Sequence, residues 1–192
     1  MINTVLTLGF DKSWRKKAVN NLIGTSVLDL GSGTGAAFDQ LLNFETTAVD
    51  PDKKMLGLNT FKNKVQGFAE DLPFEDNSFD NVFCSFVWRN VSDTNKALHE
   101  VYRVLRPGGK FVLLDMTRPK NPFLRKLHKI GTFTVLHIIG LVTLNLKEYR
   151  FLYNSLDFYP QPEEHLNKDN FIDLKIERMG LFNFVYLAVF TK

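Results

Sequence analysis

A glycine-rich segment between two acidic residues is the part of this sequence best suited to bind a small molecule. The segment Gly-Ser-Gly-Thr-Gly occupies positions 31–35 and comes after an apolar stretch. Glycines let a backbone turn sharply and approach a ligand without a Cβ in the way, and a helix after the turn would point free N–H groups at that ligand. Alone the segment is ambiguous, because Gly31, Gly33 and Ala36 also fit a loose dinucleotide fingerprint.

Asp29 lies two residues before Gly31 and favours a positively charged ligand. A pyrophosphate at this place would meet a like charge. S-adenosylmethionine (SAM) instead carries an ammonium and a sulfonium, and both suit a neighbouring carboxylate. The alternative is that Asp29 only caps the backbone amides of the loop.

Asp50 is the second acid and ends the next stretch of β-forming residues. Its carboxylate could accept hydrogen bonds from both hydroxyls of a ribose, as an acid at similar spacing does in dinucleotide folds. The alternative is an ordinary cap on a helix that begins near Asp52. Asp29, the loop and Asp50 together predict a site for a cationic nucleoside.

Alternating strands and helices must position these residues. We expect strands at 25–30, 46–49, 64–68, 79–86, 110–115, 171–178 and 182–191, and helices within 1–24 and at 36–43, 52–59 and 92–105. Met55 should face inward, Asp93 should lie in the first turn of the last helix, and Pro107-Gly108-Gly109 should end that helix. The order predicts an α/β fold: a Rossmann-like, seven-strand, mostly parallel sheet with an antiparallel C-terminal hairpin and helices on both faces. Ligands of such sheets bind beyond the carboxyl ends of the strands.

The composition fits a single domain, residues 1–192, because a chain of 192 residues with 44% hydrophobic and 23% charged content can bury a sizeable core. The net charge of +3 is too small to indicate nucleic acid as a partner. The one cysteine, Cys84, excludes an intrachain disulfide, and we identify no cleavable apolar leader. We expect a cytoplasmic protein; nothing in the sequence indicates an oligomeric state.

A helical insertion is expected at 119–156, after the fifth strand. Its residues 130–146 include no Lys, Arg, Asp or Glu, yet the run is short for a bilayer span, so we expect a buried or interfacial helix. Arg125, Lys126 and Lys129 precede the run. A basic flank beside an apolar face suits a membrane interface, so peripheral membrane contact is a hypothesis.

Two later segments carry a family resemblance. The first spans residues 69–80, beginning Ala69-Glu70-Asp71-Leu72-Pro73-Phe74, and runs into Ser85-Phe86-Val87-Trp88-Arg89-Asn90-Val91; the second is Lys96-Ala97-Leu98 with Arg103-Val104-Leu105-Arg106-Pro107-Gly108-Gly109. Together with the glycine loop they resemble the ubiquinone/menaquinone-biosynthesis C-methyltransferase family. The Arg-Asn-Val triplet is the most specific part, and the resemblance runs from about residue 8 to 156.

The resemblance implies a class I methyltransferase fold, SAM as methyl donor and a lipophilic quinol as acceptor, methylated on a ring carbon and carrying a polyprenyl chain. By position it implies SAM contacts at Thr34, Asp50, Ala69 and Ser85. Phe68 stands where the family usually has Asp or Asn. The complete set of expected cofactor-binding residues is Asp29, Gly31, Ser32, Gly33, Thr34, Gly35, Asp50, Pro51, Met55, Ala69, Glu70 and Ser85.

Arg89 and Asn90 are the expected catalytic residues, since they come after the fourth strand, where the methyl group should point. A guanidinium would lower the pKa of a bound phenol, and Asn90 could orient that phenol or a water. The alternatives are that Arg89 pairs with a surface acid such as Asp93 and that Asn90 caps the next helix. His128 and His137 lie in the helical insertion as further candidate bases. We identify no metal-binding constellation.

The sequence departs from the family pattern in its last strand, 184–191, which lacks the usual Gly and His. This departure bears on the acceptor more than on the donor. A SAM-dependent methyltransferase acting on another small or lipidic molecule therefore stays open. Two further alternatives are a SAM-binding but inactive subunit and a dinucleotide-dependent oxidoreductase.

Overall fold

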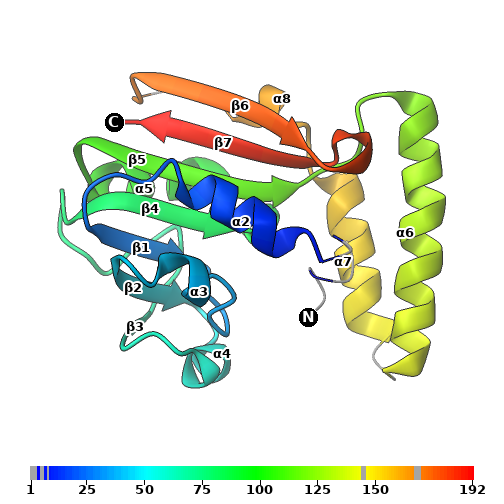
Figure 1. Cartoon of the computed structure of the whole chain (residues 1–192), viewed down its shortest axis with the longest axis horizontal. Coiled ribbons are helices and arrows are strands. Elements are labelled where there is room, and N and C mark those ends of the chain that lie inside the picture. Colours follow the sequence, from blue (N-terminus) through cyan, green and yellow to red (C-terminus); the bar gives the residue numbers. More distant parts are fainter. Residues whose placement is uncertain (1–3, 5–6, 8, 144–145, 167–169) are drawn as a thin grey trace.

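The computed structural model describes residues 4, 7, 9–143, 146–166 and 170–192. Its centre is one seven-stranded sheet in the order β3-β2-β1-β4-β5-β7-β6 (Figure 1). The strands are β1 (Ser26–Leu30), β2 (Glu45–Asp50), β3 (Asn63–Gln66), β4 (Phe79–Ser85), β5 (Leu105–Met116), β6 (Asp173–Met179) and β7 (Val185–Thr191).

The helices alternate with these strands along the chain. They are α2 (Asp11–Val19), α3 (Phe38–Leu41), α4 (Lys53–Leu58), α5 (Thr94–Val104), α6 (Pro122–Val142), α7 (Leu146–Phe158) and α8 (Pro162–His165), with the short 3-10 helices η1 (Trp88–Asn90) and η2 (Leu181–Asn183).

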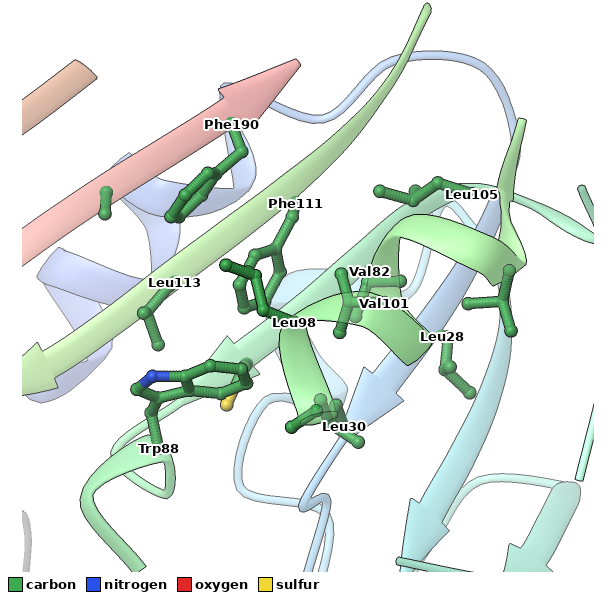
Figure 2. Packing of buried hydrophobic residues seen from close by; sticks show 14 of the residues in the cluster. Leu28, Leu30, Val82, Trp88, Leu98, Val101, Leu105, Phe111, Leu113 and Phe190 are labelled. Atoms are coloured by element: carbon green, nitrogen blue, oxygen red, sulfur yellow. The ribbon is translucent and has the colours of Figure 1, made fainter. Parts of the chain in front are cut away.

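Strands β1 to β5 pair in parallel, whereas β7 runs antiparallel to both β5 and β6. The predicted Rossmann-like fold with an antiparallel C-terminal hairpin is therefore confirmed. Successive residues of a strand point to opposite faces. Leu28 and Val82 accordingly pack beneath Leu98 of α5 (Figure 2), whereas Val27 and Phe83 belong to the core on the side of α2.

Three local expectations are wrong. The helix after the glycine loop has only four residues, because turns occupy the chain as far as Ala37. Met55 is 46% exposed, and Leu56 alone of α4 is buried. Asp93 is not inside the first turn of α5 but is its N-cap, accepting from Lys96 N.

The end of α5 also differs from the expectation. Pro107-Gly108-Gly109 does not terminate the helix, because α5 ends at Val104 and the chain turns directly into β5. Leu105 already has an extended backbone and pairs with Phe79 of β4. Cross-strand pairing thus ends the helix before proline can.

Helices α6 and α7 lie side by side beyond the carboxyl ends of β4 and β5, with α6 outermost (Figure 1). Residues 130–142 of the helix expected between 130 and 146 are part of α6, which begins at Pro122 after the N-cap Asn121. Leu146 instead begins α7, and residues 144–145 lie outside the described residues. Among the helices that the structure describes, none has the length and apolar character required to span a bilayer.

Candidate active site

The carboxyl ends of β1 and β4 form the centre of the candidate site. The chain moves from β1 outward to β2 and β3 on one side, and from β4 to β5 on the other. The loops that leave β1 and β4 therefore separate, which is where ligands bind in open α/β sheets. The glycine segment 31–35 leaves β1 at this point.

The glycine loop is held close to its neighbours. Val49 O accepts hydrogen bonds from Gly31 N at 2.9 Å and from Ser32 N at 3.0 Å, which fixes the loop against β2. Gly31 has φ 69°, and a Cβ there would lie 2.4 Å from Cγ1 of Val87 in the loop after β4. Only glycine fits at this position, so the two loops of the site are in direct contact.

Asp29 is almost completely buried, with 2% of its surface exposed. Its Oδ2 accepts a hydrogen bond from Ser32 Oγ at 2.6 Å. Burial raises the pKa of Asp29 to about 6, while the Ser32 hydrogen bond and the nearby charge of Arg15 lower it by less. Within the described residues Asp29 does not cap a loop amide, so that alternative is not supported.

Asp50 fastens the loop to the end of β2. Its Oδ2 accepts from Gly33 N at 2.8 Å and its Oδ1 accepts from Asp52 N at 2.8 Å. The N-cap of α4 is Asp52, whose side chain accepts from Lys54 N and Met55 N. Asp50 is therefore not the helix cap, and each of its oxygens keeps a lone pair for a further donor.

Asn59 holds the glycine loop through two hydrogen bonds, and no motif predicted this role. Its Nδ2 donates to Ser32 Oγ at 2.8 Å and to Gly33 O at 2.9 Å, and its Oδ1 accepts from Phe61 N. No local pattern marks Asn59, because its partners in the loop are 26 and 27 positions away in sequence.

The remaining expected cofactor residues are more scattered. Thr34, Pro51 and Met55 are exposed and Ala69 is half-buried, with the exposed Phe68 beside it. Glu70 uses one of its two carboxylate oxygens to hold the backbone before α5. Its Oε1 accepts from Ser92 N at 2.9 Å and from Asp93 N at 3.2 Å, just before α5.

Arg15 of α2 reaches the carboxyl end of β4, and it too was not predicted. It is 2% exposed and donates from Nε to Ser85 Oγ at 3.2 Å. Its Nη1 pairs with Asp11 at 2.6 Å, one helical turn earlier, and its guanidinium lies over the Phe86 ring. The only available signal in the sequence was the i, i+4 spacing of an acid and a base.

The Arg89 side chain is buried beyond the end of β4 and pairs with Asp115 of β5, not with Asp93. Arg89 N also donates to Asp115 Oδ2 at 3.0 Å, and Nη1 donates to Phe86 O at 3.1 Å. In the part of the chain that the structure describes, Nε of Arg89 is a buried donor without a partner. Asn90 is exposed at the end of η1 and does not cap α5.

The helical insertion places one of its two histidines against buried charge. Arg118 ion-pairs with Asp157 of α7 at 2.6 Å, and its Nη1 lies 3.2 Å from His128 Nδ1. Burial and the Arg118 charge lower the pKa of His128 to about 4, so it is a weak base at neutral pH. His137 Nδ1 lies 3.0 Å from Phe133 O within α6. The described residues include no group of His, Cys, Asp or Glu that could hold a metal ion.

A model of the ubiE/COQ5 methyltransferase family matches residues 1–171. The chain belongs to this family. The "Ubiquinone/menaquinone biosynthesis C-methyltransferase UbiE" of Rickettsia bellii is 34% identical, over 85% of this chain and 75% of that protein. The protein of the same name from Hahella chejuensis is also 34% identical, over 85% of this chain and 73% of its own length. The predicted resemblance to this family is thus confirmed.

Solved structures support the fold. A SAM-dependent methyltransferase of Thermotoga maritima, described as a possible histamine N-methyltransferase, has a TM-score of 0.69 at 20% identity and covers 99% of this chain and 93% of its own. A putative S-adenosyl-L-methionine-dependent methyltransferase of Methanococcus maripaludis has a TM-score of 0.62 at 21% identity. The match covers 100% of this chain and 89% of that protein. The methyltransferase family and this fold together imply that the chain uses SAM.

Proposed function

We propose that this chain is a SAM-dependent C-methyltransferase that methylates a ring carbon of a polyprenylated quinol in menaquinone or ubiquinone biosynthesis. The observation that carries the proposal is the pair of buried acids, Asp29 and Asp50, on either side of a glycine loop at the carboxyl edge of the sheet. Family membership, shown by the match over residues 1–171, then indicates a methyltransferase rather than a dinucleotide-dependent oxidoreductase.

The donor fits the residues that are present. Asp29 is a buried carboxyl whose raised pKa reflects the lack of a full counter-charge, and the ammonium of SAM would supply one. Asp50 would accept from the ribose hydroxyls through the lone pairs that its two backbone donors leave free. The exposed Phe68 and Met55 could cover the adenine, and Ala69, Ser85, Pro51 and the loop would line the rest.

Bound SAM supplies a methyl group on a sulfonium that is already an activated leaving group. The chain's own task is to align the acceptor carbon and to ionise a neighbouring hydroxyl. Arg89 would stabilise the phenolate oxygen, because its guanidinium is held by Asp115 and keeps Nε free to donate. Asn90, exposed beside it, would orient the acceptor or a water. The proton that the ring carbon loses leaves to solvent.

Helices α6 and α7, which form the expected insertion at 119–156 and continue to Phe158, would cover the acceptor, since they lie beyond the carboxyl ends of β4 and β5 (Figure 1). The deciding experiment is transfer of labelled methyl from SAM to demethylmenaquinol and to a panel of phenols. Methylation of the quinol supports the proposal. Transfer only to non-quinone molecules would favour a methyltransferase with another acceptor, and SAM binding without turnover on any acceptor would favour an inactive subunit.

Peripheral membrane contact is the second part of the proposal, and the outer side of α6 supports it. Phe123, Leu127, Ile130, Ile138 and Leu141 recur at helical spacing and are between 48% and 74% exposed. The charged residues of α6 are all basic and lie in its first half, at Arg125, Lys126 and Lys129. An apolar stripe with only positive charge beside it matches an anionic lipid surface.

Sedimentation with vesicles tests this contact. We expect binding to phosphatidylglycerol-containing vesicles that weakens in high salt and is lost in an Ile130→Glu, Ile138→Glu double variant. Ile172→Glu is the matched control, because Ile172 is equally apolar and 74% exposed but lies just before β6, away from α6. Equal sedimentation of the double variant and the control would contradict membrane contact through α6.

A further inference from the structure

A group of titratable side chains lies beyond the carboxyl ends of β4 and β5, on the α5 side of the sheet. Asp115 pairs with Arg89 and lies opposite Tyr186 in the ladder between β5 and β7. Tyr159 comes directly after α7 and packs against the hydrophobic cluster that contains Tyr186 and Trp88. The charges of Asp115 and Arg89 both act on the pKa of Tyr159. Tyr159 therefore lies near the guanidinium that we assign to the acceptor oxygen.

Tyr159 is hydrogen-bonded to His165 of α8 in a defined direction. His165 Nδ1 lies 2.8 Å from Gln161 O. Because a carbonyl oxygen only accepts, Nδ1 carries the ring proton of the neutral imidazole. The lone pair is then on Nε2, which faces the Tyr159 hydroxyl. Tyr159 thus donates to Nε2, and its own oxygen can still accept from another hydroxyl.

The surroundings keep both members of this pair uncharged at neutral pH. Burial lowers the pKa of His165, and the Gln161 hydrogen bond with the nearby carboxylates opposes this by less. Burial also raises the pKa of Tyr159 well above its usual value, so its hydroxyl stays protonated. Tyr159 can consequently pass a proton on but cannot serve as an anionic base. The titratable groups that act on the pair are Asp115, Arg89, Cys84, Tyr186, Glu163 and Glu164.

His128, in the helical insertion, is placed less well to accept a proton. Its Nδ1 lies 3.2 Å from Nη1 of Arg118, which is itself a donor and positively charged. The pKa of His128 is lowered to about 4 by burial and by this charge. His165 has a hydroxyl group in the corresponding position, so a proton can reach its free nitrogen.

We propose that Tyr159 and His165 form a proton relay that takes the proton from the acceptor's hydroxyl. The inference rests on the proposed function and deepens it, because it supplies the base for the step in which Arg89 stabilises the phenolate. The O–H bond of the acceptor breaks as an O–H bond forms on Tyr159. The proton that Tyr159 gives up forms an N–H bond on Nε2 of His165.

The relay fits the balance of the reaction. The ring carbon attacks the methyl group, the bond from methyl to sulfur breaks, and its electron pair stays on sulfur. When the ring carbon then loses its proton to solvent, the acceptor oxygen takes a proton back from Tyr159, and Tyr159 recovers one from His165. One proton is released for each methyl group transferred, as the change from a cationic sulfonium to a neutral thioether requires.

The test measures turnover of demethylmenaquinol, without oxygen, by the wild type, Tyr159→Phe, His165→Asn and the double variant. At pH 7 each single variant should lower kcat by about 100-fold, with little change in KM or in the dissociation constant of S-adenosylhomocysteine. The double variant should be no slower than the single ones, because the two groups act as a unit. The variants should regain kcat toward pH 9.5, where more of the acceptor is already ionised.

Tyr102→Phe is the matched control, because Tyr102 is also half-buried but lies on α5 against Phe171. It should keep full kcat. Tyr159→Phe retains the ring and its packing, so it decides if His165→Asn does not fold. Multiplied losses in the double variant, or a defect in kcat that is the same at every pH, would overturn the relay.

Nitrogen-15 NMR of the imidazole tests the pair without turnover. We expect the Nδ1–H tautomer for His165 and a changed Nε2 shift in Tyr159→Phe. An Nε2–H tautomer, or an Nε2 shift that does not respond to Tyr159→Phe, contradicts the relay even if the enzyme is active. Failure of the wild type to methylate demethylmenaquinol would instead refute the proposed function.

Discussion

The backbone N–H of Gly33 donates to Oδ2 of Asp50 at 2.8 Å, so the tip of the loop after β1 is fastened to the end of β2. This bond couples the shape of the loop to the acid that we assign to the ribose. Disturbing either partner should therefore affect both folding and donor binding.

Asp50→Asn should weaken binding of S-adenosylhomocysteine and lower stability together. The amide oxygen can still accept from one of the two backbone donors, Gly33 N or Asp52 N, but the NH2 group would face the other, which leaves a buried N–H unpaired at a cost of about 1–3 kcal/mol. Calorimetry and thermal unfolding measure the two effects. Asp52→Asn is the control and should change little, because Asn also caps helices well. Full ligand affinity in Asp50→Asn would remove Asp50 from the ribose site.

Donor binding should depend on pH through Asp29. Its pKa is raised to about 6, so the carboxylate that a cation needs is progressively lost below pH 6. The affinity for SAM should fall about tenfold from pH 7 to pH 5. 5′-Methylthioadenosine, which has no ammonium, should show little pH dependence over this range. Asp29→Asn should bind SAM weakly at every pH, and a pH-dependent affinity in that variant would assign the titration to another group.

The same group should affect the stability of the ligand-free protein in the opposite direction. A carboxyl with a raised pKa binds its proton more tightly in the folded state, so its contribution to stability is present below the unfolded pKa of 3.8 and is lost as pH rises through about 6. The loss is about 3 kcal/mol between these limits. Denaturant unfolding of wild type and Asp29→Asn, compared across this range, isolates the contribution of Asp29.

Arg89→Ala should reduce kcat on the true acceptor by about 100-fold or more, while the dissociation constant of S-adenosylhomocysteine changes little. The reason is that the guanidinium acts on the acceptor oxygen and lies on the α5 side of the sheet, with Asp115. Arg106→Ala is the control, since Arg106 forms an exposed ion pair with Asp80. Unchanged turnover in Arg89→Ala would leave Arg89 a structural residue only.

Glu70→Ala should destabilise the fold by about 1 kcal/mol without weakening donor binding. Its carboxylate accepts from two backbone amides before α5, so the loss falls on the start of that helix. Thermal unfolding measures the stability and ligand titration measures the affinity for the donor. Glu70→Gln should retain most of the stability. A large loss of SAM affinity in Glu70→Ala would restore the cofactor-binding role that the sequence predicts.

Local patterns predicted the succession of strands and helices along the chain, the glycine loop and its two acids, because each depends on residues close together in sequence. They could not predict that Asn59 holds the loop or that Arg15 meets Ser85, 70 positions away. The partner of Arg89 could not be predicted either. The nearby acid in the sequence is Asp93, which was the expected partner. The pairing of β4 with β5 instead places the buried Asp115, 26 positions after Arg89, beside the guanidinium.

The place of β7 has a consequence for synthesis. β7 comes after β6 in the chain, yet in the sheet it lies between β5 and β6. While the polypeptide emerges from the ribosome, β6 has no neighbour to pair with until β7 is also released. The sheet up to β5 can assemble in the order of translation. Strands β6 and β7 can join it only after both have been released, because β7 then inserts between β5 and β6, which are both made before it.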